Sequence, residues 1–178
     1  MPLRSALRAH TSDCHAAVDD IFGRFDLADP IAYRAFLSAH ARIIPAMEIR
    51  LEEAGIGSLL QDWPARRRRH LLFADLADLG ARTPPPLPAP PFEGRAALWG
   101  AAYVLEGSKL GGAMLAKRVP ASLPSRYLTP PGPKGGARSF MEALDSADTE
   151  EPRAIEAARI VFGLFRNAAE LQLELAVS

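Results

Sequence analysis

Apolar residues recur at intervals of three and four along most of this chain, which is the spacing of one face of an α-helix. Such stripes run from about residue 3 to 25, from about 151 to 177, and through "YVLEGSKLGGAMLAKR" at 103–118. No run of alternating, β-branched residues bounded by turns offers a strand. The spacing therefore predicts an all-α protein.

Capping residues give the boundaries of the expected helices. Asp29 followed by Pro30 is typical of a helix start, and this second helix should end at Gly55 with Pro45 interrupting it. The proline-rich stretch at 83–92 cannot be helical and predicts an extended connector. The other expected helices, which bring the total to about six, cover residues 3–25, 62–80, 94–118, 136–145 and 151–177.

Composition limits the class of protein. The chain has 178 residues, no net charge and a single cysteine. Its length suits one domain, residues 1–178, and no apolar run is long enough to cross a membrane. The start has no export or transit signal, so we expect a cytoplasmic protein. Zero net charge removes the usual electrostatic case for a nucleic-acid partner.

The common motifs of metalloenzymes and hydrolases are absent. There is no HExxH, no Cys-x-x-Cys and no Glu-x-x-His, so zinc proteases and di-iron carboxylate sites are disfavoured. G-x-S-x-G is missing too. His15 borders the apolar stripe of the first helix, near Val18 and Phe22. From spacing alone it is either a structural histidine or a metal ligand.

Three glycines, Gly107, Gly111 and Gly112, lie inside an expected helix. Each interior glycine costs about 1 kcal/mol relative to alanine, so together they cost about 3 kcal/mol. Either close packing of another helix or the approach of bare backbone to a flat ligand would offset this loss. The residues alone leave both explanations open.

Two stretches, "LRAHTSDCH" and "YVLEGSKLGG", resemble the heme oxygenase family, in particular the short bacterial form found beside bacteriophytochromes. The order of the two motifs also matches, and the resemblance covers most of the chain. It is weakest at about 120–137. The resemblance implies an all-α helical bundle that holds heme between the first helix and a glycine-kinked distal helix.

The resemblance also implies roles for individual residues. His15 would be the axial ligand of the iron, and Gly107 and Gly111 would bring backbone close to the porphyrin, while Gly112 allows the bend. Ser108 stands where mammalian-type members have an aspartate that holds water. The implied reaction uses O2 and electrons from a reductase or ferredoxin to cleave heme to biliverdin, carbon monoxide and ferrous iron. A bacteriophytochrome would be the bilin acceptor.

Further residues are expected around the heme edge. Arg8 lies two turns before His15, on the same side of the helix, and is the first candidate for a propionate partner. The other candidates for heme contact are Thr11, Tyr103, Lys117, Arg118 and Phe162.

Several alternatives remain at this level. A heme-binding carrier or sensor without turnover would share the same residues, and a heme-free helical interaction protein would need none of them. A thiamine-degrading relative would need a nucleophilic cysteine, for which Cys14 is a poor candidate. The run "ARRRRH" at 65–70 is expected to be a solvated helix end, with docking of an acidic electron donor as the alternative.

Overall fold

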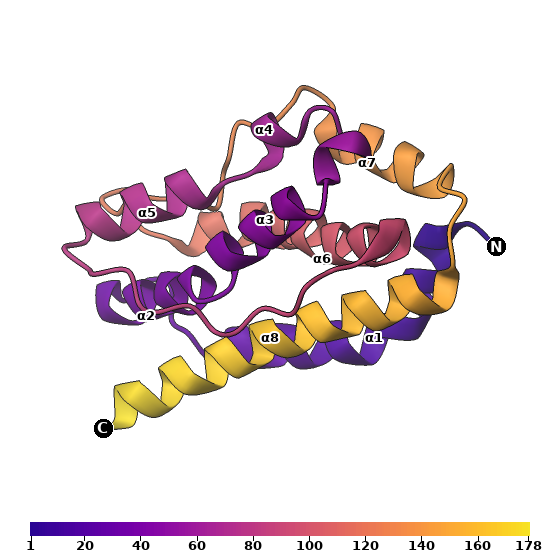
Figure 1. The fold of residues 1–178 in the computed structure, drawn as a ribbon. Helices are drawn as coiled ribbons and strands as arrows, with labels where there is room; N and C mark the ends of the chain where they lie inside the picture. Colours follow the sequence, from indigo (N-terminus) through magenta and orange to yellow (C-terminus); the bar gives the residue numbers. More distant parts are fainter.

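The last helix, α8 (Glu151–Val177), is the longest element, and the other long helices pack along it. In the computed structural model, which describes all 178 residues, α1 (Leu3–Phe22), α2 (Pro30–Ala41) and α6 (Gly94–Leu115) contact α8. Figure 1 shows α1 beneath α6, with α8 running in front of α1. No strand is present, so the predicted all-α class is confirmed.

Local sequence explains several of the helix boundaries. The Asp29 side chain accepts a hydrogen bond from the backbone N–H of Ala32 at 2.9 Å, and Pro30 occupies the first helical position. The interruption expected at Pro45 is found just before it, because α2 ends and α3 (Ile44–Glu53) begins there. Gly55 follows α3 with a φ of 87°, a left-handed conformation that favours glycine.

The chain contains more helices than the six expected from the sequence. The segment predicted as one helix at 62–80 is two helices, and the last residues of the predicted helix at 94–118 form a separate 3-10 turn. The short elements are η1 (Ile56–Ser58), α4 (Trp63–Arg66), α5 (Arg69–Asp78), η2 (Ala116–Arg118) and α7 (Gly136–Asp145).

The arginine run at 65–70 is not a solvated helix end, which corrects the expectation from the sequence. Arg66 and Arg68 are each only 2% exposed. Arg66 donates to Asp62 at 2.7 Å and to Glu106 of α6 at 3.0 Å. The helix breaks between α4 and α5, and both arginines point inward and reach side chains of α6, Arg66 reaching Glu106 and Arg68 reaching Ser108.

The other two arginines of the run bind acidic residues of the chain itself. Arg67 donates to Glu52 at 3.3 Å, and Arg69 donates to the same carboxylate at 2.8 Å. Hydrogen bonds from the Arg67 and Arg69 guanidiniums and from the Trp63 indole hold the pKa of Glu52 down to about 2, with the Arg69 bond as the largest cause. The run therefore joins α3, α4 and α5.

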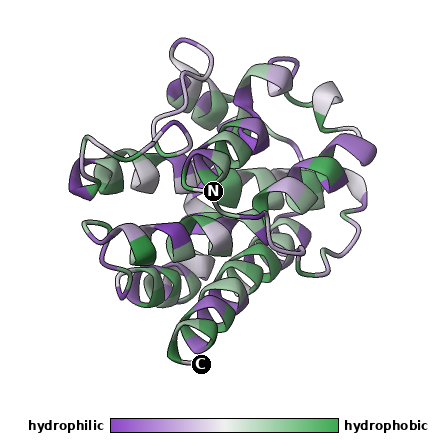
Figure 2. Ribbon diagram, turned by 90° about the vertical axis from the view of Figure 1, so that its left-hand side faces the viewer, coloured by the Kyte–Doolittle hydropathy of each residue, from purple (hydrophilic) through white to green (hydrophobic).

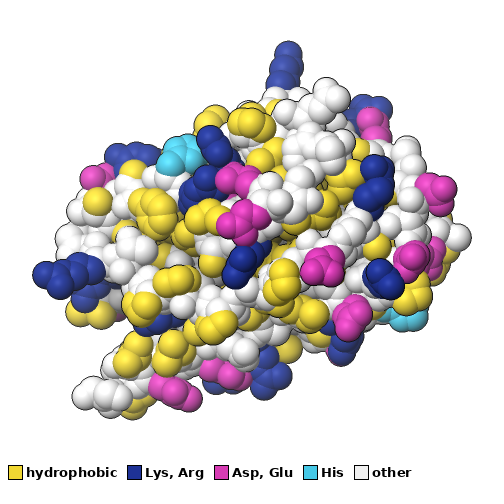
Figure 3. Space-filling model, viewed as in Figure 1, with side chains coloured by type: hydrophobic (Ala, Val, Ile, Leu, Met, Phe, Trp, Pro, Cys, Tyr) yellow, Lys and Arg dark blue, Asp and Glu magenta, His cyan; other side chains and the backbone are white.

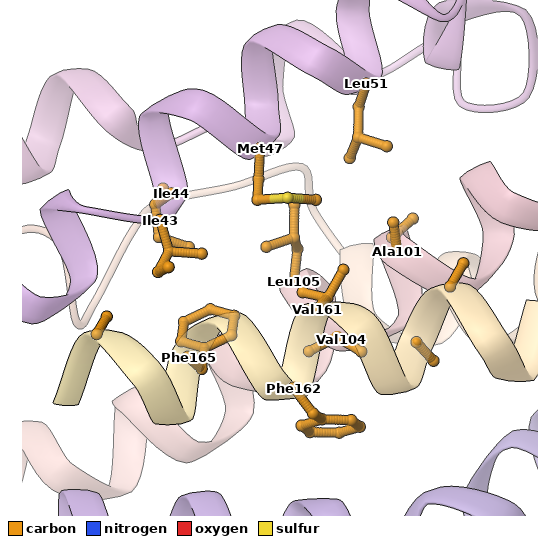
Figure 4. Packing of buried hydrophobic residues seen from close by; sticks show 14 of the residues in the cluster. Ile43, Ile44, Met47, Leu51, Ala101, Val104, Leu105, Val161, Phe162 and Phe165 are labelled. Atoms are coloured by element: carbon orange, nitrogen blue, oxygen red, sulfur yellow. The ribbon is translucent and has the colours of Figure 1, made fainter. Parts of the chain in front are cut away.

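The hydrophobic core is built by side chains from all the long helices. Forty buried residues form one hydrophobic cluster. In Figure 4, Met47 of α3, Leu105 of α6 and Val161 of α8 point toward one another. Phe162 projects from the opposite side of α8, away from this contact. Figure 2 shows hydrophobic and hydrophilic residues on every long helix, as expected of half-buried helices.

Gly100 allows α6 and α8 to pack unusually closely. A Cβ atom built on Gly100 would lie 2.0 Å from the carbonyl oxygen of Ala154 and 2.8 Å from its carbonyl carbon. Both atoms belong to the α8 backbone, so they cannot move aside like the end of a flexible side chain. The close packing that the sequence suggested for a glycine in this helix is therefore real, but it occurs at Gly100.

The surface carries charges of both signs. Figure 3 shows Lys and Arg side chains interspersed with Asp and Glu on the visible face, with no extended region of one sign. By length and apolar content, none of the helices in the structure qualifies as a bilayer span.

Candidate functional site

A cavity of about 730 Å³ lies between α1 and α6 and is closed on one side by α8. Both helices pack on α8, and the cavity is lined by side chains from all three. Its volume falls in the range of about 300–1,000 Å³ typical of small-molecule and cofactor sites. The predicted site residues that line it are Arg8, Thr11, His15, Tyr103, Gly107, Ser108, Gly111, Gly112 and Phe162.

Two predicted contacts do not reach the cavity. Lys117 and Arg118 lie in η2, after the end of α6, and both are exposed. Neither is among the cavity-lining residues. The structure therefore gives no support to these two positions as parts of the cavity wall.

His15 projects from α1 into the cavity. Its side chain is 64% exposed, and its ring centroid lies 5.9 Å from that of Phe162 on α8. Nε2 lies 3.7 Å from a carboxylate oxygen of Asp19, one turn further along α1, and makes no hydrogen bond. The imidazole is therefore accessible to a ligand while an aromatic ring packs beside it.

The glycines of α6 differ in what surrounds them. Cβ atoms added to Gly107 or Gly111 would meet no heavy atom within 4 Å. A Cβ on Gly112 would contact Leu128 at 3.4 Å, an ordinary packing distance. Helix packing therefore does not explain Gly107 and Gly111, whereas both line the cavity. The open space beside them favours the ligand explanation at these two positions.

Alanine at Gly107 or Gly111 is expected to stabilise the ligand-free protein by up to about 1 kcal/mol each. Alanine favours the helix and has room for its methyl group at both positions. Urea denaturation of the two variants beside the wild type measures the effect. A loss of stability at either position would contradict the open space assigned there.

Arg8, Thr11 and Tyr103 occupy neighbouring positions on the cavity wall. Thr11 is buried and its hydroxyl donates to the carbonyl of Leu7 at 2.7 Å. Burial raises the pKa of Tyr103, so its phenol stays neutral. Arg8 is exposed. This side of the cavity thus offers an exposed cation and the phenol of Tyr103, whereas the Thr11 hydroxyl is buried and already bonded to Leu7.

His40 lines the inner end of the cavity, which we define by His40, Arg68 and Tyr127. Its Nδ1 lies 2.9 Å from the carbonyl oxygen of Phe36. A carbonyl can only accept, so the proton is on Nδ1 and Nε2 carries a lone pair. Burial lowers the pKa of His40 to about 3. This histidine is therefore neutral at physiological pH.

The stability of the protein should fall as the pH drops from about 6.5 toward 4 because of His40. In the unfolded chain this side chain takes up a proton near pH 6.5, whereas in the folded protein it stays neutral until about pH 3. The unfolded state then binds more protons, and the loss approaches about 1.4 kcal/mol per pH unit. Urea unfolding of His40→Gln should give a pH slope smaller by about one proton, and equal slopes would contradict this assignment.

Arg68 lies behind Ser108 at the inner end. Its guanidinium donates to the Ser108 hydroxyl, which itself donates to the carbonyl of Leu105 at 2.7 Å. The guanidinium also lies over the ring of Tyr127, with its central carbon 4.4 Å from the ring centroid. Ser108 therefore has no free proton to offer, and its oxygen holds Arg68 in place.

Arg68 and Tyr127 could not have been found from the motifs. Arg68 belongs to a run that predicted a solvated helix, and the sequence gives no indication that Tyr127 meets it. His40 follows Phe36 by four and Leu37 by three in an apolar helix. That spacing resembles the signal that singled out His15, so His40 was open to prediction.

The protein offers no complete set of metal ligands. No group of three or more His, Cys, Asp or Glu side chains is arranged to hold an ion. A metal bound at His15 would therefore need further donor atoms from its own ligand, such as the four nitrogens of a porphyrin. The apolar cavity wall and the accessible imidazole fit such a flat metal complex.

Comparison with known sequences gives a partial match. No family model matches the chain. The chain is 35% identical over 91 residues to a protein of Xanthomonas campestris pv. campestris (strain 8004) named heme oxygenase. The match includes 51% of this chain and 54% of that protein, so the chain spans about half the length of the curated relative it matches.

The whole fold is similar to two solved structures. One is the NO- and CO-bound heme oxygenase from Neisseria meningitidis, with a TM-score of 0.85, 23% identity, and coverage of 98% of this chain and 93% of the other. The second is heme oxygenase from Leptospira interrogans, with a TM-score of 0.73, 21% identity, and coverage of 96% and 100%. Both structures confirm the predicted fold type. Because their sequence identity to this chain is low, the similarity concerns the fold alone.

Proposed function

We propose that this chain is a heme oxygenase, which cleaves heme with O2 and a reductant to biliverdin, carbon monoxide and ferrous iron. The observation that carries the proposal is one cavity with an accessible imidazole on α1 and two positions on α6 where a Cβ would meet only open space. The similar fold and the partial sequence match support it.

His15 would bind the iron through Nε2 as a neutral imidazole. Phe162, whose ring lies 5.9 Å away, would keep water from the bound imidazole. Asp19 lies near Nε2 in the ligand-free protein at 3.7 Å, too far for a hydrogen bond. The iron site is therefore free of any strong competing contact.

Heme would supply both the redox-active iron and the ring that is oxidised. Gly107 and Gly111 would line the opposite side of the ring with backbone, which leaves no side chain there to donate a proton from a fixed position. This is the property expected of a site that must direct oxidation to the ring rather than promote O–O cleavage. Larger side chains at these positions would fill the same space.

Ser108 is proposed to position Arg68 rather than to donate protons itself. Its hydroxyl proton is used by Leu105, and its oxygen accepts from Arg68. Where mammalian-type members have an aspartate, this chain has Ser108 with the cation Arg68 beside it. Arg68 is therefore the group at the inner end that could hold water. Protons would then pass through water held near this guanidinium.

The rim of the cavity would hold the carboxylates of heme. Arg8 is the strongest candidate, since it is a cation on the cavity wall, and Tyr103 adds a hydroxyl group. The hydroxyl proton of Thr11 is already donated to Leu7, so Thr11 would contact the ligand by packing. Lys117 and Arg118 would take part only if the end of α6 moved toward the rim. Contacts at the rim would also decide which ring position is cleaved.

The biological setting is proposed from the resemblance. Electrons would come from a reductase or ferredoxin, and a bacteriophytochrome would accept the bilin in the cytoplasm. The ion-paired arginine run offers few free cations for an acidic donor protein. Exposed cations elsewhere, among them Arg8, Lys117 and Arg118, are the better candidates for that contact.

The proposal is tested by incubating the hemin-loaded protein with a reductant and oxygen and separating the products by chromatography. We expect biliverdin, carbon monoxide and chelatable ferrous iron from the wild type. The Arg138→Met variant, an exposed change outside the cavity, should give the same products. Hemin binding without any bilin would instead indicate a carrier or sensor. No Soret band at equimolar hemin would indicate a heme-free interaction protein.

A further inference from the structure

Arg68 is a buried cation whose guanidinium has no carboxylate partner. Its side chain is 2% exposed, as is that of Arg66. Arg66 binds two carboxylates, Asp62 at 2.7 Å and Glu106 at 3.0 Å. The contacts of the Arg68 guanidinium are all neutral, namely the hydroxyl of Ser108, a carbonyl oxygen 3.5 Å away and an aromatic ring. A buried charge normally requires an opposite charge beside it.

The buried acid Glu48 lies close enough to attract Arg68 electrostatically, but it makes no hydrogen bond to the Arg68 guanidinium. Its two oxygens accept from the backbone N–H groups of Arg68 at 2.7 Å and Arg69 at 3.1 Å. The side chain of Arg69 also donates to it at 3.4 Å. Glu48 thus binds the backbone at the start of α5 and makes no contact with the Arg68 guanidinium.

The Arg68 guanidinium, which no carboxylate contacts directly, lies on the wall of the cavity. Arg68, Tyr127 and His40 all line it, and His40 is neutral. The Tyr127 hydroxyl is buried without any hydrogen-bond partner. An occupant that carries negative charge would satisfy Arg68, and a small shift of Tyr127 would give its hydroxyl an acceptor.

We propose that the inner end of the cavity is a subsite for a carboxylate-type anion, with Arg68 as its charged partner. The planar fork of a guanidinium matches the two oxygens of a carboxylate and can donate to both. Formate and bicarbonate have the required charge and shape, and a carboxylate on a larger ligand would present the same group. The subsite does not rest on the proposed reaction, because Arg68, Tyr127 and His40 form it in the protein without heme.

The test uses the full chain without heme and sodium formate as the probe. Thermal unfolding is followed as formate is added, with sodium chloride at the same ionic strength as the reference. We expect a saturating rise in melting temperature with formate and not with chloride, because binding to the native state alone stabilises it. Binding of ¹³C-formate, followed by line broadening in NMR, provides a second measurement.

Arg68→Met should weaken formate binding by about tenfold or more, since methionine replaces the aliphatic part of the arginine side chain but lacks the guanidinium group. The matched control is Arg138→Met, whose arginine is 87% exposed and lies outside the cavity. If Arg68→Met fails to fold, Arg68→Lys keeps the charge but removes the planar guanidinium, and it should bind formate more weakly than the wild type. Equal stabilisation by formate and chloride, or unchanged binding in the Arg68 variant that folds, would overturn the proposal.

A second arm identifies the source of the carboxylate. Formate binding is measured again with hemin bound. Competition between the two would place a carboxylate of the larger ligand on Arg68, and independent binding would assign the subsite to a free anion. Both results support the subsite. A protein that binds formate but no hemin would reject the proposed function alone.

Discussion

Replacing Gly100 with alanine is expected to lower the free energy of unfolding by about 3 kcal/mol or more. The new Cβ would lie 2.0 Å from the carbonyl oxygen of Ala154, 2.8 Å from its carbonyl carbon and 3.1 Å from its Cα. No rotamer change relieves a clash between backbone atoms and a Cβ. The two helices would have to separate, and α6 and α8 share much of the core.

Urea denaturation of Gly100→Ala measures this effect. Gly107→Ala is the matched control, since it makes the same change in the same helix where a Cβ meets only open space. The two variants should differ in sign as well as size. A Gly100→Ala protein as stable as the wild type would show that α6 and α8 are farther apart than the structure places them.

Replacing His15 with alanine is expected to weaken hemin binding by about 100-fold or more, which corresponds to about 2.8 kcal/mol. The chain provides no other histidine on the outer part of the cavity, because His40 lies at the buried inner end. The absorption spectrum of a histidine-ligated heme should be lost as well. Free imidazole should restore it, because alanine leaves the space of the ring empty.

The matched control for His15→Ala is His10→Ala. His10 lies on the same helix, is exposed and does not line the cavity. Its removal should change neither the hemin affinity nor the spectrum. Unchanged binding in His15→Ala, or a spectrum that imidazole does not alter, would remove His15 from the proposed iron site.

Local sequence predicted much of the fold because its signals are short-range. Asp29 and Pro30 begin a helix as expected, and the final helix has the predicted bounds, 151–177. The cavity also contains His15 and the glycines that the two motifs suggested. Caps and apolar periodicity depend on neighbours a few residues away, so they can be recognised in one sequence.

The break between α4 and α5 depends on distant residues and was not predictable in this way. Arg66 pairs with Glu106, forty positions further along the chain. The local pattern of four arginines favours a continuous solvated helix, and tertiary pairing overrides it. The same reason hid Arg68, whose contacts with Ser108 and Tyr127 also come from distant segments.

The glycines illustrate a similar limit. Spacing alone left packing and ligand approach as equal explanations for Gly107 and Gly111, and the open space beside them in the structure now favours the ligand. Gly112 packs against Leu128, and α6 continues through it without interruption, so its expected role in a bend stays a prediction. Gly100 carries the close packing, which depends on where α8 lies.

A crystal structure of the full chain loaded with hemin would test the central claim most directly. We predict that Nε2 of His15 binds the iron, and that Gly107 and Gly111 are the closest backbone on the other face of the porphyrin. Hemin outside the cavity between α1 and α6, or iron bound by a residue other than His15, would contradict the account. Gly112 closest to the iron would contradict the roles assigned to the three glycines.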